Sequence, residues 1–78
     1  MNNRIITSTI DARGLRCPMP LLKAKQELSR MRSGQLLEIK TTDPKSLDDF
    51  RAYTDIVGHE LLKSESEENH FVIWVQKS

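Results

Sequence analysis

The chain has 78 residues, and its 12 Lys and Arg residues almost balance 11 Asp and Glu residues, giving a formal net charge of +1. This length allows one compact core, so we expect a single domain over residues 1–78. The near-neutral charge provides no long-range positive field, so it disfavours a general nucleic-acid binder, and we expect no direct nucleic-acid contact. The single cysteine excludes an intramolecular disulfide and indicates a reducing compartment, so we expect the cytoplasm.

The first predicted strand covers residues Arg4 to Ala12, where apolar and polar residues alternate. No long apolar run follows the N-terminal charge, so we expect no signal peptide, no membrane-spanning helix and no membrane contact. Gly14 ends the strand. After Pro18, apolar residues recur at helical spacing, which predicts an amphipathic helix that ends at Ser33-Gly34. Its apolar stripe consists of Leu21, Ala24, Leu28 and Met31.

The second strand is predicted over Leu36 to Thr41, and a second helix follows at once. Asp43 is a good N-cap residue, and Pro44 suits the first helical position. Gly58 is expected to end this helix. The apolar face of the second helix is predicted to contain Leu47, Phe50, Thr54 and Val57.

Two further strands are predicted at His59 to Glu65 and at Phe71 to Val75. The last is apolar on both faces, which favours a central position, whereas the earlier strands resemble edges. Right-handed crossovers would place both helices on one side of the sheet. The sequence therefore predicts an α/β two-layer sandwich of order β-α-β-α-β-β, with a mixed four-stranded sheet and two helices packed on one face.

Cys17 is the candidate catalytic residue, because it precedes the first predicted helix. Unpaired backbone N–H groups and the macrodipole give a helix N-terminus a positive potential, and this potential favours the nucleophilic thiolate. Pro18 pre-sets the first turn and Pro20 stiffens it, but neither has an N–H group to donate. The N–H groups of Met19, Leu21 and Cys17 itself are therefore expected to face the sulfur.

Neighbouring residues support an exposed, reactive thiol. Arg13 and Arg16 are expected to add positive charge, and Gly14 leaves space for another protein to approach. Many lone cysteines only fill a core, but a loop cysteine between Arg and Pro is a poor core candidate. Because no resolving cysteine exists, the thiol must be acylated, be oxidised or exchange sulfur with another molecule. The predicted supporting residues are Arg13, Gly14, Arg16, Pro18, Met19 and Pro20.

The segment from Asp11 to Pro20 contains Gly14-Leu15-Arg16-Cys17-Pro18-Met19-Pro20 and resembles the TusA-like (SirA-like) sulfur carrier family. Asp43-Pro44 and Gly58-His59-Glu60-Leu61 also resemble that family, so the similarity extends over almost the whole chain. It implies the same fold, with the last strand antiparallel and inserted between the second and third. It differs at Met19, where some family members have an acidic residue, and this position bears on the choice of partner.

The resemblance also implies a function as a sulfur carrier or sulfurtransferase. A cysteine desulfurase or a rhodanese-like donor would place a persulfide sulfur on Cys17, and a DsrE-like acceptor protein would remove it. The destinations implied are tRNA 2-thiouridine synthesis, molybdenum cofactor assembly and sulfur oxidation. We expect a monomer. We also expect no cofactor and no independent turnover chemistry, because no Walker-type or G-x-G-x-x-G loop is present.

Two other functions stay open on the sequence: a thiol redox sensor at Cys17 and a non-catalytic protein-interaction module. His59 and His70 lie far apart in sequence and lack enough companion ligands, so no metal site is expected. Lys23, Lys25 and Arg30 form either a solvated helix face or positive charge around the Cys17 end that steers an acidic partner. The acidic run from Glu65 to Glu68 is expected to be a solvated turn, and Trp74 an aromatic residue on the sheet.

Overall fold

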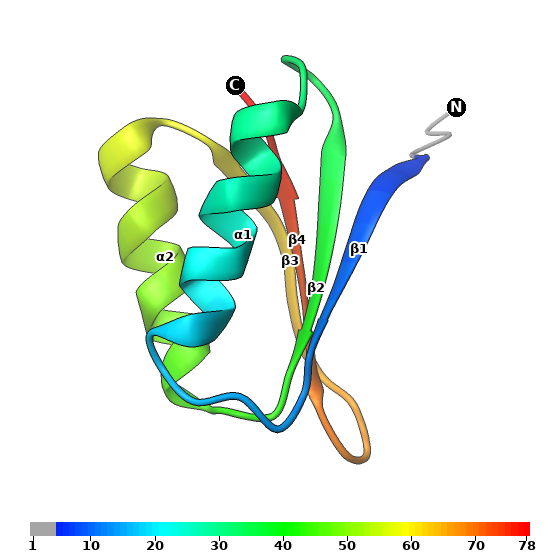
Figure 1. Ribbon diagram of the computed structural model, residues 1–78, viewed down its shortest axis with the longest axis vertical. Helices are drawn as coiled ribbons and strands as arrows, with labels where there is room; N and C mark the ends of the chain where they lie inside the picture. Colours follow the sequence, from blue (N-terminus) through cyan, green and yellow to red (C-terminus); the bar gives the residue numbers. More distant parts are fainter. Residues whose placement is uncertain (1–4) are drawn as a thin grey trace.

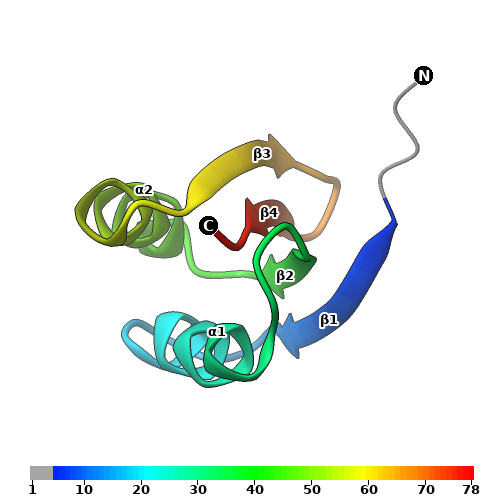
Figure 2. The same ribbon diagram turned by 90° about the horizontal axis from the view of Figure 1, so that it is seen from above.

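The computed structural model describes residues 5–78 and has the predicted order of elements (Figure 1). The start that we predicted for the first strand, Arg4, lies outside the described residues. Both helices cover the same face of one sheet, as the view from above makes plain (Figure 2). The elements are β1 Ile6–Ala12, α1 Met19–Arg30, β2 Leu36–Thr41, α2 Lys45–Val57, β3 Glu60–Ser66 and β4 Phe71–Gln76.

The four strands lie in the order β1-β2-β4-β3. β1 and β2 are parallel, whereas β4 runs antiparallel to both β2 and β3. The central position predicted for Phe71 to Val75 is confirmed. The prediction that all earlier strands are edges is wrong for β2, because β4 pairs with its free side through contacts such as Ile39 opposite Ile73.

The core fills the space between the helices and the sheet. Leu37, Ile39, Ile73 and Val75 are fully buried on the inward face of β2 and β4, whereas Glu38, Lys40 and Trp74 on the other face are partly exposed. Phe50 is the largest fully buried side chain and brings α2 into this layer. The buried cluster consists of Ala12, Ala24, Leu28, Met31, Leu37, Ile39, Phe50, Ile73 and Val75.

The helix ends differ from the predictions by short distances. α1 begins at Met19, with Pro18 at the N-cap, and it ends at Arg30 instead of continuing to Ser33-Gly34. Gly34 has a φ of +87°, but it lies in the turn that leads to β2, about one helical turn after the end of α1, so it does not end the helix itself.

The second helix begins one residue later than predicted, with Pro44 at the N-cap position and Lys45 as the first helical residue. It ends as predicted at Gly58, which has a left-handed φ of +90°. Val57 was predicted on its buried face, but it is 45% exposed and lies outside the core.

Candidate functional site

Cys17 belongs to the loop that leads from β1 to α1. This loop lies beside the one that leads from β2 to α2, at the carboxyl ends of the two parallel strands (Figure 1). Two parallel strands with helical crossovers bring their outgoing loops to one edge of the sheet, which is where α/β proteins commonly bind ligands. The loop after β1 and the loop after β2 form an open pocket of about 420 Å³ at this edge. It is lined by Gly14, Leu15, Arg16, Cys17, Thr42, Asp43, Pro44 and Lys45.

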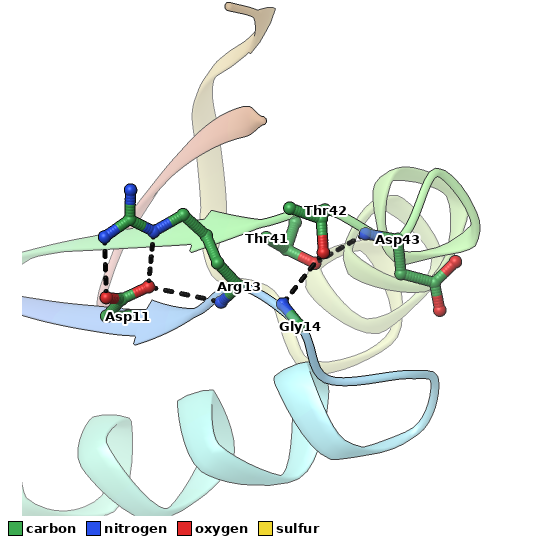
Figure 3. Close-up of polar contacts among 6 residues, drawn as sticks. All are labelled: Asp11, Arg13, Gly14, Thr41, Thr42 and Asp43. Carbon is green, nitrogen blue, oxygen red and sulfur yellow. Dashed lines mark hydrogen bonds and ion pairs between the residues drawn. The ribbon is translucent and has the colours of Figure 1, made fainter. Parts of the chain in front are cut away.

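Hydrogen bonds join the two loops. Between the loops, the N–H of Gly14 donates to Oγ1 of Thr42 at 2.9 Å, while within the segment after β2 the N–H of Asp43 donates to Oγ1 of the buried Thr41 at 3.1 Å (Figure 3). The N–H of Cys17 donates to Oδ2 of Asp43 at 2.7 Å. The Cys17 loop is therefore held against the start of α2 by specific polar contacts.

The Cys17 side chain is exposed, and its sulfur contacts a carboxylate of α2. Sγ lies 2.7 Å from Oδ2 of Asp49, and the thiol donates to this oxygen. This hydrogen bond raises the pKa of the Cys17 thiol, because only the protonated sulfur can donate. Partial loss of hydration and the negative charges of Asp49 and Asp43 raise it further, while Lys45 lowers it.

The pKa of the Cys17 thiol is therefore shifted in the direction opposite to the one that the sequence predicted. Two of the three N–H groups that we expected to face the sulfur have other acceptors. The Met19 N–H donates to the carbonyl of Arg16 at 2.8 Å, and the Cys17 N–H donates to Asp43. Because these two N–H groups are bonded elsewhere and two carboxylates lie close to the sulfur, the positive potential of the helix start does not decide the direction of the pKa shift of Cys17.

Asp43 combines two contacts in one side chain. Its Oδ1 accepts the Lys45 N–H at 3.0 Å, at the start of α2, and its Oδ2 accepts the Cys17 N–H. These two hydrogen bonds lower the pKa of Asp43, because the ionised carboxylate is the better acceptor. The predicted helix-capping role accounts for only one of them.

Of the two arginines predicted to add positive charge near Cys17, Arg13 is neutralised by a neighbour. Its guanidinium donates to both carboxylate oxygens of Asp11, at 2.8 and 2.9 Å, and the backbone N–H of Arg13 also donates to Asp11 (Figure 3). The pair raises the pKa of Arg13 and lowers that of Asp11. Arg16 lines the Cys17 pocket together with Lys45, which the sequence had not indicated.

The lysines and the arginine of α1 do not surround the Cys17 pocket. Arg30 lies in the last turn, at the opposite end of α1, 3.5 Å from Glu27. Lys25 lies over the Tyr53 ring at 5.2 Å. Lys23 and Arg30 line a separate hollow beside Ile10 of β1. The steering role suggested for these three residues is therefore wrong for Arg30 and is not supported by the positions of the other two.

An apolar groove of about 380 Å³ lies between the two helices, next to the Cys17 pocket. Asp49 connects the two regions, because it lines the groove and also contacts Sγ of Cys17, which lines the pocket. Ile56 is 83% exposed at this groove, and Met19 is 44% exposed at the start of α1. The groove is lined by Leu21, Lys25, Asp49, Ala52, Tyr53, Ile56 and Val57.

Within residues 5–78, no three His, Cys, Asp or Glu side chains gather in a way that would hold a metal ion. Nδ1 of His59 instead forms hydrogen bonds with the hydroxyl and the backbone N–H of Ser78. No helix in that same part of the chain is both long and apolar enough to span a bilayer.

Comparison with known proteins agrees with this arrangement. The family described as "Sulfurtransferase TusA" matches residues 8–77. This chain belongs to the TusA family. Among curated relatives, the sulfur carrier protein TusA of Allochromatium vinosum is 45% identical over 69 residues, which are 88% of this chain and 91% of that protein. The putative sulfur carrier protein YrkI of Bacillus subtilis is 38% identical over 68 residues, which are 87% of this chain and 91% of that one.

The fold of the TusA family is also seen in a solved structure. The crystal structure of a SirA-like protein from Desulfitobacterium hafniense superimposes with a TM-score of 0.80 and covers 90% of this chain and 96% of that one. At 21% identity this similarity supports the fold alone. The predicted α/β two-layer sandwich is thereby confirmed.

Sequence reasoning missed the polar partners of Cys17, which are Asp49 and Asp43, and it missed that Thr42 and Lys45 line the same pocket. Asp43 and Asp49 are 26 and 32 residues away in sequence, so no local motif points to them. The predicted topology carried a usable signal, because two parallel strands bring the start of the second helix beside the start of the first.

Proposed function

We propose that this chain accepts a persulfide sulfur on Cys17 from a donor protein and relays it to an acceptor protein. The observation that carries the proposal is an exposed single thiol in an open pocket at the edge of the sheet. An exposed sulfur at such an edge can be approached by the cysteine of another protein. Relatives named as sulfur carriers, which align over most of this chain, support the same function.

The absence of a second cysteine restricts the chemistry. The persulfide on Cys17 cannot collapse to an internal disulfide, so the sulfur stays available for an external thiol. Arg13, Gly14, Arg16, Pro18, Met19 and Pro20 are proposed to shape the approach to Cys17. The donor is proposed to be a cysteine desulfurase or a rhodanese-like protein, and the acceptor a DsrE-like protein that serves tRNA thiolation, molybdenum cofactor assembly or sulfur oxidation.

The raised pKa of Cys17 lowers the thiolate fraction that both oxidation to a sulfenic acid and sulfur transfer require, so it does not separate the redox-sensor hypothesis from the carrier hypothesis. A carrier tolerates a protonated resting thiol if a partner promotes ionisation on docking. The interaction-module hypothesis differs in that it makes no use of the sulfur at all.

The test is loading by a cysteine desulfurase with cysteine as the sulfur source. We expect intact-protein mass spectrometry to show the gain of one sulfur atom, and a reductant to remove it. Cys17→Ser is the matched control, since it changes one atom and must gain nothing. A wild-type protein that stays unloaded under conditions where another persulfide acceptor is loaded would contradict the proposal, and so would a Cys17→Ser variant that retains full biological activity.

A further inference from the structure

The contact between Cys17 and Asp49 depends on the proton of the thiol. Sγ lies 2.7 Å from Oδ2 of Asp49, and a carboxylate can only accept, so the sulfur must supply the proton. Asp49 is partly buried on α2, whereas Cys17 is exposed on the loop before α1. The contact therefore fastens an exposed thiol to the neighbouring helix.

The charged groups around the sulfur come from three segments. Asp49 and Lys45 belong to α2, Asp43 lies in the loop before it, and Arg16 lines the same pocket from the loop after β1. α1 places Lys25 at the groove that Asp49 also lines. The hydrogen bond to the Asp49 carboxylate has the largest effect on the pKa of the Cys17 thiol, and it raises that pKa, which favours the protonated form.

Loading with sulfur removes the proton that makes this contact. In the transfer, Sγ of Cys17 attacks the terminal sulfur of the donor persulfide, a new S–S bond forms at Cys17, and the S–S bond of the donor breaks. The donor cysteine leaves as a thiolate and ends with the proton that Cys17 has lost, so no external oxidant or reductant is needed. Sγ then carries a second sulfur instead of hydrogen.

The terminal sulfur of a persulfide is more acidic than a thiol and carries the negative charge at neutral pH. In place of a donated hydrogen bond, Asp49 then faces an anion, with Asp43 as a second negative group. Like charges at such short range repel each other, and solvent or a partner protein offers the sulfur a better environment.

We propose that Asp49 is a positioning residue that distinguishes the two states of Cys17: it holds the unloaded thiol against α2 and repels the loaded persulfide outward to the acceptor. The second half rests on the proposed sulfur-carrier function, whereas the first half does not. The unloaded protein is protected from chance alkylation and oxidation, and the loaded sulfur is presented on the surface.

The unloaded state is tested without any sulfur donor. The rate of Cys17 alkylation by iodoacetamide is measured against pH for wild type and Asp49→Asn, with Asp48→Asn as the matched control, since Asp48 is the exposed neighbour on the same helix. We expect Asp49→Asn to shift the pH profile to lower pH and to react roughly three- to tenfold faster at neutral pH, because a fall of one pKa unit gives about ten times more thiolate.

Asp48→Asn removes an equal charge from the same helix turn, so it should follow the wild-type profile. Restoring a carboxylate in Asp49→Glu should move the profile back towards wild type. Trp74 fluorescence checks the fold, and Asp49→Ser replaces Asp49→Asn if the latter does not fold. Superimposable pH profiles of alkylation for wild type and Asp49→Asn would overturn the proposal. A shift in Asp48→Asn equal to that in Asp49→Asn would also overturn it.

The loaded state is tested by carbon-13 NMR of the aspartate carboxyl groups after treatment with inorganic polysulfide, with mass spectrometry to verify the added sulfur. We expect the Asp49 resonance to move to its position in Cys17→Ala, which has no donor, while Asp48 stays unchanged. An Asp49 resonance that does not move on loading would overturn the proposal. Absence of any added sulfur would contradict the carrier function instead, and the alkylation result would stand.

Discussion

The backbone N–H of Cys17 donates a 2.7 Å hydrogen bond to the Asp43 carboxylate, so the loop after β1 and the loop after β2 are fastened to each other at the residue that bears the sulfur. The same carboxylate accepts the Lys45 N–H at the start of α2. Asp43 is thus the point at which the position of the Cys17 loop is coupled to that of a helix.

Replacing Asp43 should change the acid dependence of stability. The pKa of Asp43 lies below its ordinary value of 3.8 in the folded protein, so its contribution is fully present above that value and is lost as the pH falls through the folded pKa. Asp43→Asn, which mimics the protonated group, should have a lower urea midpoint than wild type at neutral pH, and the difference should narrow as the pH falls below 3.8. A difference that stays constant with pH would contradict this expectation.

Removing the Thr42 hydroxyl should loosen the Cys17 loop. Oγ1 of Thr42 accepts the Gly14 N–H, and Thr42→Val keeps the shape of the side chain but removes the acceptor. We expect the Gly14 amide to exchange with deuterium about three- to tenfold faster, as the loss of one ordinary hydrogen bond implies. Thr42→Ser is the matched control and should keep the protection, so equal exchange in both variants would refute the role of the hydroxyl.

A side chain at Gly58 should destabilise the protein through the backbone alone. Gly58 ends α2 with a φ of +90°, and an added Cβ would meet no atom within 4 Å. Gly58→Ala should therefore lower the free energy of unfolding by about 1–2 kcal/mol. Gly58→Asn should cost less, because Asn tolerates the left-handed region. Equal losses in chemical denaturation would indicate a cause other than backbone conformation.

Two isoleucines offer a paired test of where the core lies. Ile73 is fully buried in β4, whereas Ile56 is 83% exposed on α2. Ile73→Val should lower the free energy of unfolding by about 0.5–1.5 kcal/mol, because it leaves a small cavity. Ile56→Val removes the same methylene from a solvated site and should change it by less than about 0.5 kcal/mol. The comparison is made by urea denaturation monitored by Trp74 fluorescence.

The elements of the fold could be read from residue periodicity, because burial on one side forces a period of two in strands and about 3.6 in helices. The apolar run of β4 identified it as central, because β2 and β3 pair with its two edges and side chains of both its faces are buried or partly buried. The same reasoning failed for β2, where Glu38 and Lys40 suggested a free face and an edge. Both residues are only partly exposed beside β4, and Glu38 accepts a hydrogen bond from Trp74 there, so polar residues are accommodated on an interior strand.

The site was harder to predict than the fold. The position of Cys17 follows from its local motif, but the charge state of its sulfur depends on Asp49, which approaches from a different helix. A general rule about helix N-termini cannot determine that state, because a carboxylate in direct contact outweighs a partial dipole charge. Only the packing of α2 beside α1 brings the two side chains together.

The insertion of β4 between β2 and β3 has a consequence for synthesis. Until Phe71–Gln76 leaves the ribosome, β1 and β2 share no sheet with β3, because β4 is the strand that joins them. α1 packs on β1 and β2, whereas α2 packs on β3, so before β4 is added only the contacts between the two loops and between the two helices hold Cys17 near Asp49. The continuous sheet that supports both helices is complete only when the final strand has been added.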